Sequence, residues 1–347
     1  MDDSTESGYH SLQDLALHRD LIYSSDDSTR IYKMYEDFYD GFLNYADKLV
    51  SDALTSRQLA TYTVPVLMKA LIQPQYAIRA FFAAADACVI DVSTAQTFWD
   101  QGAAVLVGSI EAADVGGEGS SNGMSWYALG KEFCEHFKCG DGVDEQGVYE
   151  QGDYKNPPAL RKMMDNVELG RQAISKSDCT LVLKKVRAME SLLLVPIIQG
   201  VLYHSAKRQQ TGEDSHYGAA WAFGKAVLPV LNVRSRSDAE VIADTLFTPG
   251  NYEAADLWTA MMLSLPDFGI ECEDIGEDTM GILGGQTFCN HIENATEFPT
   301  PAPNPTTTRV PTRLPTISPT AEDASDEINA AVIGGYQFTN HADAESK

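Results

Sequence analysis

The sequence predicts an all-α protein, a helical bundle built from two related halves. Three observations favour this fold class. The alternation of apolar and polar residues that is typical of strands is scarce, apolar residues recur at steps of three and four, and one helical pattern is present twice. The 347 residues are 44% hydrophobic, which is enough for a sizeable core.

The repeated pattern joins two dipeptides to two pentapeptides. When Gln101-Gly102 is aligned with Gln199-Gly200, and a shorter loop is allowed in the second copy, Tyr127–Lys131 falls on Trp221–Lys225. Both pentapeptides read aromatic-Ala-x-Gly-Lys and are expected at helix starts. An internal duplication explains this order, and a chance likeness between short Ala/Gly-rich helices is the alternative.

Each copy also contains an apolar segment without a polar side, at 103–107 and at 192–202. A helix that is apolar all round belongs in the middle of a bundle. Each half, about 28–140 and 158–265, is therefore expected to contain one buried central helix, and the halves to pack about a pseudo-twofold axis.

The remaining helices are predicted from apolar periodicity and capping residues. Ser28 is the expected N-cap of an amphipathic helix over 31–50, and Asp91 to Ser93 is the expected cap of the helix that contains Gln101. Prolines are expected to break two helices, at Pro74 and Pro196. The predicted ranges are 64–87, 160–174, 179–203, 219–228, 238–246 and 252–263, and the chain is expected to be irregular after Pro266.

Composition divides the rest of the chain. Residues 1–25 are polar and expected to be disordered, 28–298 form the helical domain, and 299–320 form a Pro/Thr-rich linker. The tail, 321–347, repeats the Gly-Gly-x-x-Phe-x-Asn-His pattern of 284–291.

The chain is strongly acidic, with a net charge of −25. Such a field repels nucleic acid and anionic lipid and attracts cations, so nucleic acid is excluded as a partner. No apolar run approaches the roughly 18 residues of a membrane span.

Six cysteines include no Cys-x-x-Cys pair. Cys134 and Cys139 flank a turn, and Cys272 and Cys289 bracket an acidic loop, so local disulfides are expected, although spacing alone leaves their connectivity open. Asn294 begins a glycosylation sequon beside the linker. These features favour an extracellular, cell-surface or periplasmic location, although the first residues lack the basic and apolar regions of a signal peptide.

Motifs for catalysis are missing from the sequence. There is no Gly-x-Ser-x-Gly elbow and no His-Glu-x-x-His pair. The Gly-rich string at 117–123 follows a helix and lacks the Lys-Ser/Thr pair of a phosphate loop. The chain is therefore interpreted as a binding protein and not as an enzyme.

Metal binding through oxygen and nitrogen ligands is the more specific interpretation. Asp100 and Glu111 are eleven residues apart, about three helical turns, so they share one face of an apolar helix. Tyr203 and His204 occupy the matching helix of the second copy. Carboxylate, phenolate and imidazole ligands together suit ferric iron. Ordinary structural roles remain the alternative for each residue alone, and for Glu132 and His136, one turn apart, surface pairing is favoured.

Several segments carry a resemblance to a known family. They are Trp99 to Glu111, which reads Trp-Asp-Gln-Gly-Ala-Ala followed by Gly-Ser-x-Glu, then Tyr127-Ala-Leu with Cys134 and Cys139, and Val195-Pro-Ile-Ile-Gln-Gly200. Over 62–291 the chain resembles the algal low-iron-inducible, iron-assimilating periplasmic proteins, a family that includes high-CO2-inducible secreted proteins and is related to the diatom phytotransferrins.

The resemblance implies a secreted or cell-surface protein that captures ferric iron, with carbonate as a synergistic anion, and delivers it to an uptake pathway through a receptor. An arginine such as Arg79 or Arg208 could anchor the carbonate. The alternative function is a structural or adhesive acidic surface module. In that case the loop from Glu271 to Asp278 would bind wall polymer or calcium without specific iron binding.

Overall fold

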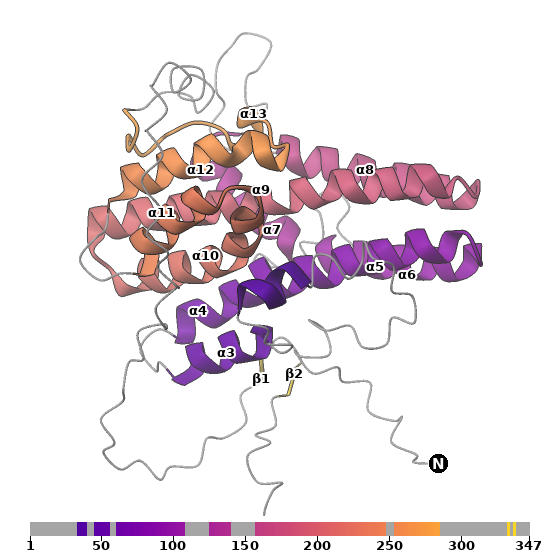
Figure 1. Cartoon of the computed structure of the whole chain (residues 1–347), viewed down its shortest axis with the longest axis horizontal. Helices are drawn as coiled ribbons and strands as arrows, with labels where there is room; N and C mark the ends of the chain where they lie inside the picture. The colour runs from indigo at the N-terminus through magenta and orange to yellow at the C-terminus, as the bar shows by residue number, and fades with distance from the viewer. Residues whose placement is uncertain are drawn as a thin grey trace, which may run out of the picture. The chain divides into compact units, whose positions relative to one another are not determined.

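The computed structural model of the chain describes residues 33–39, 45–55, 60–107, 125–139, 157–247 and 253–284, together with 332–333 and 336–337. The chain divides into two compact units, 12–295 and the combination of 1–11 with 296–347. The described residues of the larger unit are mainly helical, so the predicted all-α class is confirmed (Figure 1). Glu111, Cys289, Asn294, the linker and most of the tail lie outside the described residues.

The larger unit has the following elements, in chain order: α3 (Tyr45–Thr55), α4 (Ala60–Leu67), the π-helical turn η1 (Met68–Ile72), α5 (Gln73–Cys88), α6 (Val92–Val107), α7 (Trp126–Phe137), α8 (Pro158–Ser175), α9 (Cys179–Thr211), α10 (Asp214–Arg234), α11 (Arg236–Phe247), α12 (Ala254–Phe268) and α13 (Cys272–Ile275). In the smaller unit, β1 (Val332–Ile333) pairs antiparallel with β2 (Tyr336–Gln337).

Helix α9 is the centre of the bundle. Every residue from 192 to 202 is buried, and α5, α7, α8, α10 and α12 all pack against this helix (Figure 1). The predicted central helix of the second half is therefore confirmed. Its all-round apolar sequence follows from having neighbours on every side.

Helix α6 does not meet the same prediction. Gln101 and Ala104 are exposed, and one side of the helix is buried against α5 and α8. The two aligned glycines also have different neighbours, because Gly102 lies against Phe81 of the preceding helix and Gly200 against Phe223 of the following helix. The internal duplication stays a prediction.

The predicted break at Pro196 is wrong. Helix α9 runs continuously through Pro196, and α10 runs through Pro229. Proline removes one backbone hydrogen bond, but both residues are buried, and packing against neighbouring helices offsets this cost. At Pro74 the chain remains helical too, with η1 directly before the first turn of α5, where proline is tolerated.

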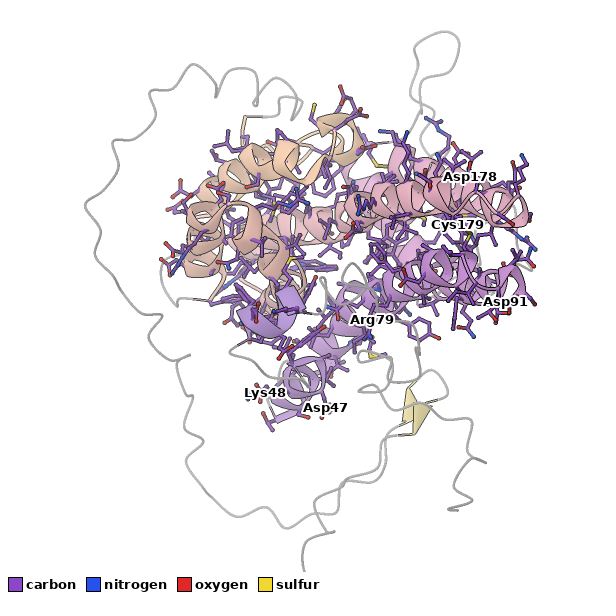
Figure 2. The ribbon with its side chains drawn as sticks, turned by 45° about the vertical axis from the view of Figure 1, so that its right-hand side comes forward. Asp47, Lys48, Arg79, Asp91, Asp178 and Cys179 are labelled. Atoms are coloured by element: carbon purple, nitrogen blue, oxygen red, sulfur yellow. A yellow bond between two sulfur atoms is a disulfide. The ribbon has the colours of Figure 1, made fainter. Side chains whose placement is uncertain are left out.

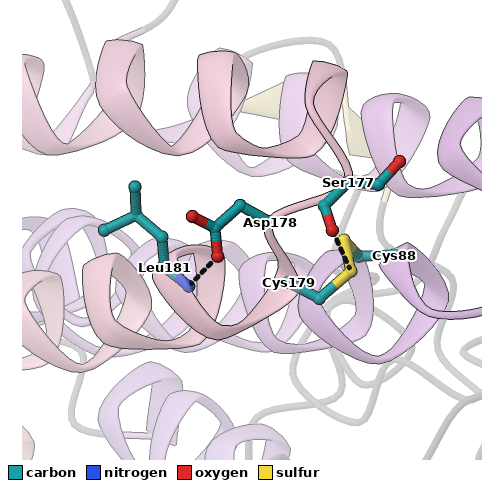
Figure 3. The surroundings of a disulfide bond; sticks show 5 residues. All are labelled: Cys88, Ser177, Asp178, Cys179 and Leu181. Atoms are coloured by element: carbon teal, nitrogen blue, oxygen red, sulfur yellow. Dashed lines mark hydrogen bonds between the residues drawn. A yellow bond between two sulfur atoms is a disulfide. The ribbon is translucent and has the colours of Figure 1, made fainter.

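A disulfide ties the ends of two helical hairpins together. Cys88 ends α5 and Cys179 begins α9, and their Cα atoms are 5.6 Å apart (Figure 3). Beside it, the Asp178 carboxylate accepts a hydrogen bond from the Leu181 amide at 3.1 Å and caps α9. Asp91 caps α6 in the same way, as the sequence predicts, by accepting from Ser93. Figure 2 shows Asp91, Asp178 and Cys179 at the same end of the bundle.

Candidate functional site

Three histidines and one tyrosine meet where α7, α9 and α10 pack together. We call His136, Tyr203, His204 and His216 the imidazole cluster. Gly212, with φ of 72°, ends α9 in the left-handed conformation and lets α10 turn back along it. His216 in the first turn of α10 therefore returns to His204 near the end of α9, and the last turn of α7 adds His136.

The closest approach in the cluster joins two ring nitrogens. His204 Nδ1 lies 2.9 Å from His216 Nδ1. Burial lowers the pKa of His204 to about 3, and the neighbouring His216 and His136 contribute to this shift. Burial lowers the pKa of His216 as well, against the opposing effect of Glu213. Both rings are consequently neutral near pH 7, and one Nδ1 donates a hydrogen bond to the other.

Tyr203 separates this pair from the third histidine. The His136 ring stacks on the Tyr203 ring with centroids 4.2 Å apart, and the Tyr203 and His204 centroids are 5.0 Å apart. Burial, and then the charge of Glu132, raise the pKa of the Tyr203 phenol. Burial also lowers the pKa of His136. Near pH 7 the cluster thus has neutral imidazoles and a protonated phenol.

Packing fixes the orientation of the His204 ring. It stacks on Phe223 with centroids 5.7 Å apart and meets the edge of Phe133 at 5.9 Å. Phe223 can approach because Gly200, one turn before His204, has no side chain. A Cβ atom there would lie 2.6 Å from the Phe223 ring. Gly200 therefore helps to position His204 through Phe223.

A disulfide and two hydrogen bonds hold His136 in place. Cys134 and Cys139 are bonded, as expected from the sequence, so His136 lies inside a closed loop at the end of α7. The Thr279 hydroxyl donates to the His136 carbonyl at 2.5 Å, and the Glu277 amide donates to the Phe137 carbonyl at 2.7 Å. The segment after α13 thereby fastens α7 beside α9.

The other two predicted metal ligands are Asp100 and Glu111. Asp100 is exposed on α6, and its carboxylate lies 3.8 Å from the Arg171 guanidinium. Of the predicted ligand set, the structure brings Tyr203 and His204 together, gives Asp100 a basic neighbour, and leaves Glu111 outside the described residues. Within the part of the chain that the structure describes, no group of three or more His, Cys, Asp or Glu side chains is arranged to hold a metal ion.

The two predicted anion-binding arginines lie on different helices. Arg208 is one turn after His204 on α9, and its guanidinium stacks 4.0 Å from the centre of the Tyr217 ring. Arg79 lies on α5, apart from the capped end of the bundle (Figure 2). Helical spacing therefore places Arg208 on the same side of α9 as His204, whereas Arg79 belongs to another helix.

The acidic loop after α12 is tied to the protein itself. Lys162 on α8 donates to the Asp274 carboxylate at 3.0 Å and to Glu271 at 2.5 Å. Asp278 accepts hydrogen bonds from the backbone amides of Met280, Ile282 and Leu283. These carboxylates shape the loop, which leaves fewer of them to bind calcium or polymer.

Sequence reasoning missed His216 and the disulfide between Cys88 and Cys179, and it assigned His136 to the surface. The sequence contains one feature that indicates His216. Gly212 lies between His204 and His216, and a helix that ends at this glycine and turns back would bring the two histidines together. Cys272 is also disulfide-bonded, and Cys289, the cysteine expected to flank the same loop, lies outside the described residues. Spacing gave no signal for the bond from 88 to 179.

The chain matches no known protein family, no curated protein and no solved structure. None of the helices in the described ranges combines the length and apolar character needed to cross a bilayer. The class that fold and site define is a disulfide-bonded helical bundle with an imidazole cluster.

Proposed function

We propose that the protein is a binding protein that captures iron outside the cell or at its surface for uptake. The observation that carries the proposal is the meeting of Tyr203 and His204, both expected as ligands, with two further imidazoles. Imidazole nitrogen and phenolate oxygen are both good ligands for iron. The resemblance of 62–291 to iron-assimilating proteins supports the same cargo.

Capture of the ferric form would use Tyr203 as a phenolate. Burial opposes its ionisation in the free protein, but a bound cation reverses this preference because its charge stabilises the phenolate. Carbonate would neutralise more of the ion's charge, and Arg208 is the better placed arginine to hold it. The acidity of the chain attracts cations and so favours their encounter with the site.

Titration with ferric citrate, with and without bicarbonate, tests the proposal. The expected result is bound iron by elemental analysis and a phenolate-to-iron absorption band that Tyr203→Phe removes. Tyr217→Phe is the matched control and should keep the band. Absence of bound iron under both conditions would refute capture of the ferric form, and absence of binding in the ferrous form as well would refute iron capture altogether.

The acidic surface module remains the second candidate from the sequence. It predicts weak, unselective divalent binding by the loop over 271–278. The pairing of Lys162 with Glu271 and Asp274 supports a structural role for this loop instead.

A further inference from the structure

The contact between His204 and His216 has the dimensions of a chelate. Two nitrogens that each lie about 2.1 Å from one metal ion are about 3.0 Å apart at a right angle and about 3.4 Å apart at a tetrahedral angle. The observed separation of the two Nδ1 atoms is 2.9 Å. Replacement of the shared proton by a metal ion then requires both rings to turn until their lone pairs converge on one point beside the line that joins the two nitrogens.

The surroundings of the pair hold the His204 ring and place a negative charge beside His216. Phe133 and Phe223 fix the His204 ring. The other nitrogen of His216, Nε2, lies 3.9 Å from a Glu213 carboxylate oxygen. At this distance the carboxylate places a negative charge beside the His216 ring, which favours a bound cation.

The donor set also discriminates between ions. The two convergent donors are neutral nitrogens, and no carboxylate contacts either Nδ1 among the described contacts. Ferric iron is hard and prefers anionic oxygen ligands, whereas neutral imidazole suits the borderline divalent ions of the first transition row. His216 retains 20% of its side-chain exposure, so water can reach the site and complete the coordination.

Resting on the proposed function that the imidazole cluster captures iron, we propose that the His204–His216 pair chelates a borderline divalent transition ion. Ferrous iron is then the cargo, and zinc and copper are competitors of the same class. With two protein ligands and water, the site binds reversibly, as a protein that passes its ion onward requires.

The test uses the untagged full chain with its disulfides intact. Isothermal titration calorimetry measures the binding of Zn²⁺, Cu²⁺ and, without oxygen, Fe²⁺, each added as the metal alone. Electron paramagnetic resonance of the Cu²⁺ form should show coordination by two imidazole nitrogens. His216→Ala should weaken the binding of each ion by about tenfold or more, and Lys184→Ala, at an exposed position of α9 outside the imidazole cluster, by less than about threefold.

His216 lies near the surface, so its variant should fold, and circular dichroism checks this. His204→Gln provides a second variant that keeps a polar side chain and removes the Nδ1 donor. Unchanged affinity in both variants, or no binding of any divalent ion, would overturn the chelate.

The outcomes separate the chelate from iron capture. If Zn²⁺ and Cu²⁺ bind through the pair and iron binds in neither oxidation state, the chelate stands and the proposed function fails. If Fe³⁺ binds with a phenolate band that His216→Ala leaves unchanged, and this variant also leaves the affinity for the divalent ions unchanged, the chelate fails and iron capture stands.

Discussion

The ammonium nitrogen of Lys225 lies 4.1 Å from the centre of the Phe247 ring, and the Trp221 ring is 5.3 Å away. The side chain is buried on α10. Burial lowers the pKa of this lysine to about 8, although the charge of Asp52 acts in the opposite direction. The attraction between the cation and the rings only partly compensates for the lost hydration.

Stability should consequently depend on pH through Lys225. Because the folded pKa of about 8 lies below the ordinary 10.5, the unfolded chain binds the proton more tightly, and stability rises between these pH values. Lys225→Met should stabilise the protein at pH 7 by about 2 kcal/mol, since a burial cost of about 3 kcal/mol is offset by a lost cation–π attraction of about 1 kcal/mol. Urea unfolding from pH 7 to 10.5 measures the free energy of unfolding of the wild type and of the variant. Lys184→Met, at an exposed site, is the control. If the free energy of unfolding rose with pH equally steeply in Lys225→Met and in the wild type, the role assigned to Lys225 would be contradicted.

The two described disulfides should differ in their contribution to stability. The bond from Cys88 to Cys179 spans 91 residues and that from Cys134 to Cys139 spans five. Removing a disulfide lets the unfolded chain gain loop entropy, so replacing the first pair by alanine should cost about 4.6 kcal/mol and replacing the second about 2 kcal/mol. Chemical unfolding of both double variants tests the order, and a larger loss from the short loop would contradict it.

Lys162 should matter most above the pKa of Asp274. Burial raises the pKa of this carboxyl, and Lys162 lowers it again. In Lys162→Met the buried carboxylate loses its partner, so stability near pH 7 should fall by about 2 kcal/mol, less than for a fully buried pair because the lysine is 41% exposed. Since the raised pKa means that the folded state holds the proton more tightly, the deficit should shrink as the pH falls through that pKa. Thermal unfolding at pH 4 and pH 7 measures the stability that Lys162→Met loses at each pH, and Lys184→Met is the control. A loss of stability that is the same at both pH values would contradict the pairing.

Local pattern was sufficient to predict much of the bundle. The run over 192–202 has no polar face, and a helix with neighbours on all sides is the structure that accommodates it. The apolar run over 103–107 carries less information because alanine tolerates both burial and exposure, and α6 lies at the surface. The predicted break at Pro196 was wrong because tertiary packing outweighs the cost of one missing backbone hydrogen bond there.

The candidate site could be predicted only in part. Tyr203 and His204 are neighbours in sequence, so one helical pattern indicated both. His216 joins them through the turn of a hairpin, and His136 through the packing of α7, neither of which periodicity reveals. Asp100 was selected by spacing from Glu111, but spacing did not predict the nearby Arg171 on α8.

Gly200 provides the last prediction, because it connects packing to the site. An added Cβ would lie 2.6 Å from the Phe223 ring, which stacks on His204. Gly200→Ala gains helix propensity but overpacks the core, so we expect a net loss of about 1 to 2 kcal/mol and weaker Zn²⁺ binding as Phe223 displaces His204. Phe223→Leu removes the ring that clashes, so Gly200→Ala should cost less in that background. Denaturation and calorimetry of the four proteins in this double-mutant cycle measure the coupling. Additive effects on stability, or Zn²⁺ affinity that the single Gly200 variant leaves unchanged, would show that the glycine does not position the ligand.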